Sequence, residues 1–131
     1  MKIVLNGTFD IVHVGHLRML NYARTLGNHV LVCIDSDRRV QELKGATRPI
    51  NTQQERQELL ESLRAVDKVL VFDSDQELID ILQEYQADVM VKGSDWKQQG
   101  YVGQEYCKTT QWFDRIDEYS STKKIQDISN R

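Results

Sequence analysis

Two histidines near the N-terminus have the spacing of side chains that act on one ligand. His13 and His16 follow the turn Gly7-Thr8-Phe9-Asp10 and enclose Gly15. Residues three apart share one face of a helix, so both imidazoles can face the same group. Glycine lets a ligand approach the backbone closely, and the amides and dipole of a helix N-terminus favour an anion. The segment therefore predicts a triphosphate site in which both imidazoles donate hydrogen bonds as charge builds in the transition state.

The histidine pair has two plainer interpretations, namely partly buried helix residues or a metal pair. Zinc requires more ligands than two, and neither Cys33 nor Cys107 has the spacing to supply them. The Gly-Thr-Phe-Asp turn in front of the pair and Gly15 within it favour phosphate binding. Asp10 is near enough to matter to a metal that accompanies a triphosphate, but it can equally cap the start of the helix. We assign no residue as a metal ligand.

Two further polar segments also suit a nucleotide. In Lys92-Gly93-Ser94-Asp95-Trp96, Asp95 can accept from a base or ribose, and Trp96 offers a stacking face. The alternative is a polar turn with one packed aromatic ring. Ser120, Ser121 and Thr122 stand at the predicted start of the last helix, where hydroxyl donors suit phosphates and also serve as ordinary caps.

Three cations could close over a phosphate. Lys44 and Arg48 lie in a basic loop, and Arg56 lies one turn into a helix that Thr52 caps. For each of them the ordinary alternative is a solvated surface charge.

Strands and helices alternate along the chain, which predicts parallel βαβ units. The strands are expected at 3–5, 30–34, 69–72, 89–91 and 111–116, and the helices at 14–26 and after residues 52, 74 and 120. Residues 38–43 are expected to form no more than a helical turn, and Gly27-Asn28 to end the first helix with a left-handed cap. Ligands of such sheets bind beyond the carboxyl ends of the strands, which here points to residues 6–16, 35–37 and 92–96.

The composition limits the class of protein. The chain has 131 residues, 40% of them hydrophobic and 28% charged, with a formal net charge of −3. This indicates one globular domain over residues 1–131, with no membrane span, no secretory leader and no broad nucleic-acid surface. Cys33 is expected to be a buried free thiol, and the cytoplasm is the expected compartment.

The run from Gly7 to His16 resembles the GxFDxxHxGH motif of the cytidylyltransferase-like nucleotidyltransferases, and the resemblance extends over about residues 2–128. It implies a Rossmann-like three-layer α/β/α fold with a five-stranded parallel sheet. It also implies that the phosphate of an acceptor attacks the α-phosphorus of an NTP in line, that pyrophosphate leaves, that Mg²⁺ accompanies the NTP, and that the protein can form a homodimer.

The residues and the resemblance together give a predicted site in three parts. Catalysis is assigned to His13, His16, Thr8, Lys44 and Arg56; nucleotide binding to Gly7, Thr8, Phe9, Asp10, Gly15, His16, Lys92, Gly93, Asp95, Trp96, Arg115, Ser120, Ser121 and Thr122; and acceptor binding to Lys44, Arg48 and Arg56.

Two branches of the family compete for the substrate. Residues 43–50, 54–56, 65–67, 91–93 and 102–103 resemble the heptose 1-phosphate adenylyltransferase domain of ADP-heptose synthesis, which uses ATP. Thr8, Trp96 and Arg115 resemble glycerol-3-phosphate cytidylyltransferase, which uses CTP. The first branch is favoured because more of the chain supports it. A non-catalytic nucleotide-binding regulator on the same fold is the alternative of another class.

Overall fold

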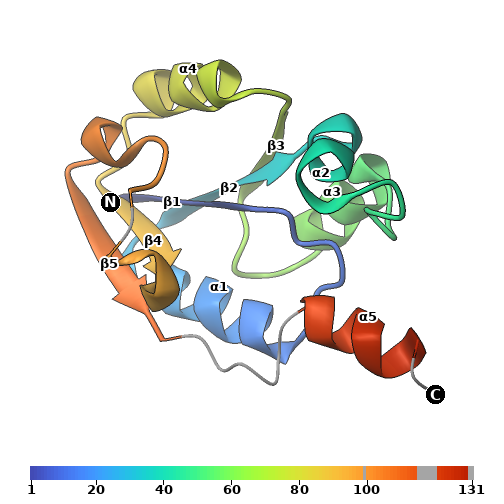
Figure 1. Ribbon diagram of the computed structural model, residues 1–131. Coiled ribbons are helices and arrows are strands. Elements are labelled where there is room, and N and C mark those ends of the chain that lie inside the picture. The colour runs from blue at the N-terminus through green and yellow to red at the C-terminus, as the bar shows by residue number, and fades with distance from the viewer. Residues whose placement is uncertain (99, 115–120, 130–131) are drawn as a thin grey trace.

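A parallel sheet of five strands forms the centre of the molecule (Figure 1). The computed structural model describes residues 1–98, 100–114 and 121–129. The strands are β1 (Lys2–Gly7), β2 (His29–Asp35), β3 (Lys68–Phe72), β4 (Val89–Gly93) and β5 (Thr109–Phe113), in the spatial order β3-β2-β1-β4-β5. Every neighbouring pair is parallel. The order reverses direction between β1 and β4, so their carboxyl ends mark the place where a ligand is expected.

Helices cover both faces of the sheet. They are α1 (Val14–Leu26), α2 (Asp37–Lys44), α3 (Gln53–Glu61), α4 (Asp75–Tyr85) and α5 (Ser121–Ser129), with short 3₁₀ turns η1 (Ser94–Trp96) and η2 (Gln104–Tyr106). Leu20 of α1 and Leu60 of α3 pack on one face of the sheet, whereas Leu78 and Leu82 of α4 pack on the other. Figure 1 shows α1 and α4 on opposite sides of the sheet. The predicted three-layer Rossmann-like fold is therefore confirmed.

The helix boundaries follow from local side-chain caps. Thr52 and Glu55 form the predicted reciprocal capping box at the start of α3. Ser74 accepts from the amide of Glu77, but the Glu77 carboxylate accepts from Asp73 rather than from Ser74. Among the described helices, none combines the length and the hydrophobicity that crossing a membrane requires.

Three elements differ from the sequence prediction. Segment 37–44 is a full helix, because Ser36 caps it by accepting from the amide of Arg39. The last strand begins two residues earlier than predicted, at Thr109. Gly27 has an extended backbone with φ −162°, not a left-handed one, and a Cβ there would lie 2.4 Å from the carbonyl oxygen of Met1. Glycine is thus required at residue 27 for close packing rather than for chain reversal.

Candidate active site

A cavity of about 550 Å³ opens at the carboxyl ends of β1, β2 and β4, where the strand order reverses. It brings together the predicted residues Gly7, Thr8, Phe9, His13, Gly15, His16, Lys44, Lys92, Gly93, Asp95 and Trp96. The predicted residues Asp10, Arg48 and Arg56 are not among those that line it. Arg115 and Ser120 lie outside the described residues, and Ser121 and Thr122 fall in the first turn of α5.

The two histidines cap the helix that carries them. His13 is the N-cap of α1, and its Nδ1 accepts from the amide of Gly15 at 3.1 Å. The Nδ1 of His16 accepts from the amide of His13 at 3.2 Å, and the two rings stack with centroids 3.8 Å apart. A neutral imidazole whose Nδ1 accepts a hydrogen bond carries its own proton on Nε2. The local backbone therefore sets both tautomers and leaves the proton of each ring on Nε2, and both residues line the cavity.

The turn before the histidines has a constrained backbone. Phe9 has φ +52°, a left-handed conformation that a bulky residue rarely adopts. Its buried ring lies 4.9 Å from the ring of His16, centroid to centroid. A Cβ at residue 7 would lie 3.2 Å from the Phe9 ring, so Gly7 is the residue that leaves room for this turn. The ring of Phe9 therefore packs against the ring of His16.

Lys92 lines the cavity at the end of β4. Its Nζ is 3.4 Å from Asn6 Oδ1 and lies over the rings of Trp96 and Tyr101, at 4.8 and 5.5 Å from their centroids. Burial lowers the pKa of Lys92, although the charges of Asp35 and Asp95 act in the opposite direction. This part of the cavity combines a buried cation with a partly exposed indole.

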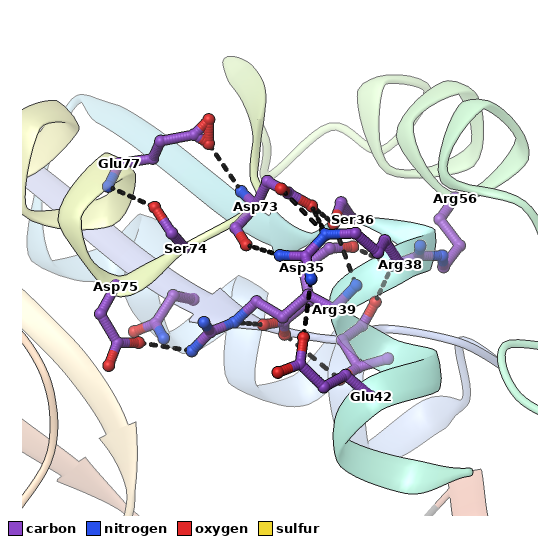
Figure 2. A network of polar contacts seen from close by, with 12 residues as sticks. Asp35, Ser36, Arg38, Arg39, Glu42, Arg56, Asp73, Ser74, Asp75 and Glu77 are labelled. Carbon is purple, nitrogen blue, oxygen red and sulfur yellow. Dashed lines mark hydrogen bonds and ion pairs between the residues drawn. The ribbon is translucent and has the colours of Figure 1, made fainter. Parts of the chain in front are cut away.

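An ion-pair chain that the sequence did not predict lies at the end of β2, and two of its members, Asp35 and Arg39, line the cavity. Asp35 ends β2 and is 8% exposed; its Oδ2 accepts from the Thr8 hydroxyl at 3.3 Å and its Oδ1 from Arg39 Nε at 2.8 Å. Figure 2 shows Arg39 extending from α2 between Asp35 and Asp75, which accepts from Arg39 Nη2 at 2.5 Å. The rule for strand ends pointed to residue 35, and the spacing of four to Arg39 was the available signal for the pair. The Thr8 hydroxyl thus donates a hydrogen bond to Asp35, whereas the sequence predicts that this hydroxyl donates to a phosphate.

Arg56 has a different position from the one its predicted role requires. It is fully buried, and its guanidinium donates to the carbonyl oxygens of Thr8, Asp35 and Asn51 and to the carboxylate of Asp37, at 2.8–3.1 Å. A guanidinium has five N–H donors, and most of these are engaged. The geometry fits a residue that holds the ends of β1 and β2 together better than one that contacts the acceptor.

Asp10 and Arg48 form a second buried connection behind the first turn. Asp10 accepts from Arg48 Nε and from the amides of Ile50 and Asn51, each at 2.9 Å. Burial alone would raise the pKa of Asp10, but the hydrogen bonds from Asn51, Ile50 and Arg48 together lower it. Arg48 Nη2 is buried and has no hydrogen-bond partner within the described residues. Asp10 therefore anchors the loop after α2 and does not cap α1, a role that His13 takes.

The sequence of the chain matches a known protein family. The profile of the family described as cytidylyltransferase-like matches residues 4–129. The chain belongs to this family. The predicted resemblance is confirmed, and with it the reaction class of a nucleotidyltransferase.

Curated relatives of this cytidylyltransferase-like chain carry the name bifunctional protein HldE. The one from Campylobacter fetus is 39% identical over 94% of this chain, and the one from Koribacter versatilis is 40% identical over 95%. The chain spans only 27% and 26% of the length of those two relatives. A crystal structure of the lipopolysaccharide core biosynthesis protein from Thermoplasma volcanium superposes with a TM-score of 0.74 at 21% identity, covering 89% of this chain and 98% of that one, which shows a shared fold.

The described residues do not offer this family member a metal cage of its own. Within them, no group of three or more His, Cys, Asp or Glu side chains could hold an ion. Asp10, the acidic residue of the first turn, is enclosed by Arg48 and two amides and is not among the residues that line the cavity. Mg²⁺ usually keeps several waters and binds through substrate phosphates and few carboxylates, and the magnesium ion expected to accompany the NTP stays a prediction.

Proposed function

We propose that this chain transfers a nucleoside monophosphate, with ATP as the favoured donor, to a phosphorylated sugar of the heptose 1-phosphate type. The observation that carries the proposal is the reciprocal cap of His13 and His16, which leaves the proton of each ring on Nε2 in two residues that line the cavity. The relatives named HldE and the resemblance of residues 43–50 and 91–93 to the heptose branch support the acceptor.

In this reaction an oxygen of the acceptor phosphate forms a bond to the α-phosphorus, and the bond to the bridging oxygen of pyrophosphate breaks. No covalent intermediate with the protein is needed, so its contribution is positioning and charge stabilisation. His13 and His16 donate to the α-phosphate and to the departing phosphate oxygens, and the N-terminal end of α1 adds its dipole. Magnesium enters with the NTP as part of the substrate.

The other predicted roles are divided by position. Lys92, Gly93, Asp95 and Trp96 bind the nucleoside on the β4 wall, with Arg115, Ser120, Ser121 and Thr122 as further nucleotide contacts that the sequence predicts. Lys44 lines the cavity at the end of α2 and binds phosphate there. Arg48 and Arg56 act behind the cavity, by holding the loop and the strand ends that form it.

The decisive assay measures pyrophosphate release by the purified chain. ATP and CTP are each combined with heptose 1-phosphate, other sugar 1-phosphates and glycerol 3-phosphate. Release with ATP and heptose 1-phosphate at a kcat/KM well above the other pairs is expected. Activity confined to CTP and glycerol 3-phosphate contradicts the proposed substrates while leaving the reaction class intact. Nucleotide binding without turnover of any acceptor favours the regulatory alternative.

A further inference from the structure

We propose that Asp35, held in place by Arg39, binds hydroxyl groups of the sugar part of the acceptor. This inference rests on the proposed function, because it concerns the same cavity and assumes a phosphorylated sugar as the second substrate. It assigns the ion-pair chain Asp35–Arg39–Asp75 a part in acceptor specificity.

Among the described residues, only part of the hydrogen-bonding capacity of the Asp35 carboxylate is used. A carboxylate offers about four acceptor positions, and here Thr8 and Arg39 occupy one on each oxygen. The residue is 8% exposed and lines the cavity. A buried ionised carboxylate is costly unless its hydrogen-bonding positions are filled, so this wall favours a ligand that brings hydrogen-bond donors.

The charge of Asp35 selects among possible ligand groups. A phosphate next to an ionised carboxylate is repelled, whereas a hydroxyl donates to it in a short charge-assisted hydrogen bond. Phosphates are instead favoured at the N-terminal end of α1. The hydrogen bond from Thr8 to Asp35 connects the turn that precedes α1 with the end of β2. A molecule with a phosphate at one end and hydroxyls at the other fits this division of charge.

Arg39 is a positioning residue in this arrangement. Its Nε binds Asp35, its Nη2 binds Asp75 of α4, and its guanidinium lies over the Phe72 ring at 5.2 Å from the centroid (Figure 2). These contacts fix the carboxylate of Asp35 from the side. Phe72 and Leu78 also line the cavity, but each is only 1% exposed, so Asp35 and Arg39 supply the polar surface that a ligand would meet here.

The test is the variant Asp35→Asn, with Asp73→Asn as the matched control. Asparagine keeps the shape of Asp35 and an oxygen for the Thr8 hydroxyl but removes the charge. Asp73 belongs to the same polar network, where it binds Ser36 and Arg38, but it is not among the residues that line the cavity. The KM for the sugar phosphate should rise about 10- to 100-fold in Asp35→Asn, the range for a lost hydrogen bond to a charged group. The KM for the NTP should stay within about twofold, and Asp73→Asn should change neither KM by more than that.

Deoxy analogues of the acceptor make the test independent of the variant. Wild-type enzyme should lose about tenfold or more in kcat/KM for at least one analogue that lacks a single hydroxyl, and Asp35→Asn should lose much less for the same analogue. A melting curve for each variant checks folding. If Asp35→Asn does not fold, equal turnover of every deoxy analogue by the wild type overturns the inference, and selective loss supports it.

The remaining outcomes separate this inference from the proposed function. An unchanged acceptor KM in Asp35→Asn, or an equal rise in both KM values, overturns the role of Asp35 while the wild type still uses sugar phosphates. Failure of the wild type to use any sugar phosphate refutes the proposed function itself, and the inference with it, before any variant is made.

Discussion

The first turn of α1, which holds His13 and His16, and the network of contacts made by Arg39, Arg48 and Arg56 are built in opposite ways. In the first turn of α1, the amide of Gly15 donates to His13 and the amide of His13 donates to His16, so the partners are two and three residues apart. In the network, Arg48 reaches Asp10 across 38 residues, Arg39 reaches Asp75 across 36, and Arg56 reaches Thr8 across 48. The first region is formed by neighbouring residues, whereas the second requires the segments that follow β1, β2 and β3 to lie close together.

Under the proposed function, this difference assigns the reaction step to the cap of His13 and His16 and the choice of acceptor to the network of distant residues. A helix cap made of consecutive residues keeps its geometry wherever the helix forms, so it suits the step that all substrates share. Of the network of distant residues, Asp35 and Arg39 line the cavity, and the proposed function gives them a part in what binds there. Changes in the network should therefore affect stability and acceptor choice, and changes in the first turn should affect turnover.

The largest effect is expected for Arg56→Met, a change in the network. Methionine keeps much of the volume but leaves the buried carbonyls of Thr8, Asp35 and Asn51 without their donor. Breaking a buried charged contact in this way costs about 3–5 kcal/mol of unfolding free energy, measurable by urea denaturation. Arg38→Met is the control, because the exposed Arg38 pairs with Asp73 and Glu42 at the surface, where its loss should lower the unfolding free energy far less than that of Arg56. Equal losses would contradict the distinction between the buried and the exposed arginine.

His16→Ala tests the first turn. The change should lower kcat by on the order of 10²–10³-fold, as for loss of other transition-state donors, with a much smaller effect on NTP binding. Stopped assays of pyrophosphate release give kcat, and calorimetric titration gives the affinity for the NTP. An equal loss of turnover and of binding would argue against a role in the transition state and for a simple binding site.

Asp10→Asn tests the connection behind the turn through its pH dependence. Because the folded pKa of Asp10 lies below the ordinary value of 3.8, its charge stabilises the fold fully above that value and loses this effect as pH falls through the folded pKa. At pH 7 the variant should be less stable than the wild type by about 1.5–3 kcal/mol. The gap should shrink in acid, as followed by urea denaturation from pH 7 to about pH 2. A gap that stays constant over this range would show that the charge of Asp10 contributes nothing.

Thr8→Val should have the smallest effect, because it removes one hydrogen bond between the two regions. Loss of the bond from Thr8 to Asp35 should cost about 1 kcal/mol of unfolding free energy. The fall in kcat should be smaller than for His16→Ala. A loss of turnover as large as that of His16→Ala would mean that Thr8 acts on the substrate directly, as the sequence suggested.

The sequence predicts most short-range contacts correctly and misses the long-range ones, and segment 37–44 is a short-range exception. Helix 14–26 and the Thr52–Glu55 cap were predicted correctly because their determinants lie within one or two turns. The segment 37–44 was underestimated because its sequence carries no strong apolar period, and the cap from Ser36 was overlooked. For Gly27 the sequence predicts a left-handed helix cap, whereas the structure requires a glycine because of the close contact with Met1, 26 residues away.

The sequence by itself determined the family, the parallel sheet and the reaction class, because a strand, a glycine turn and two histidines at fixed spacing are local features. Only the tertiary structure decided the use of each cation and carboxylate. Arg56 and Lys44 are both basic residues in one part of the chain, yet one is buried behind the site and the other lines it. Asp35 and Arg39 became part of the cavity because β2 ends beside β1 and α4 brings Asp75 within reach. A side chain's charge is set by its type, but its partner is set by packing between elements distant in sequence.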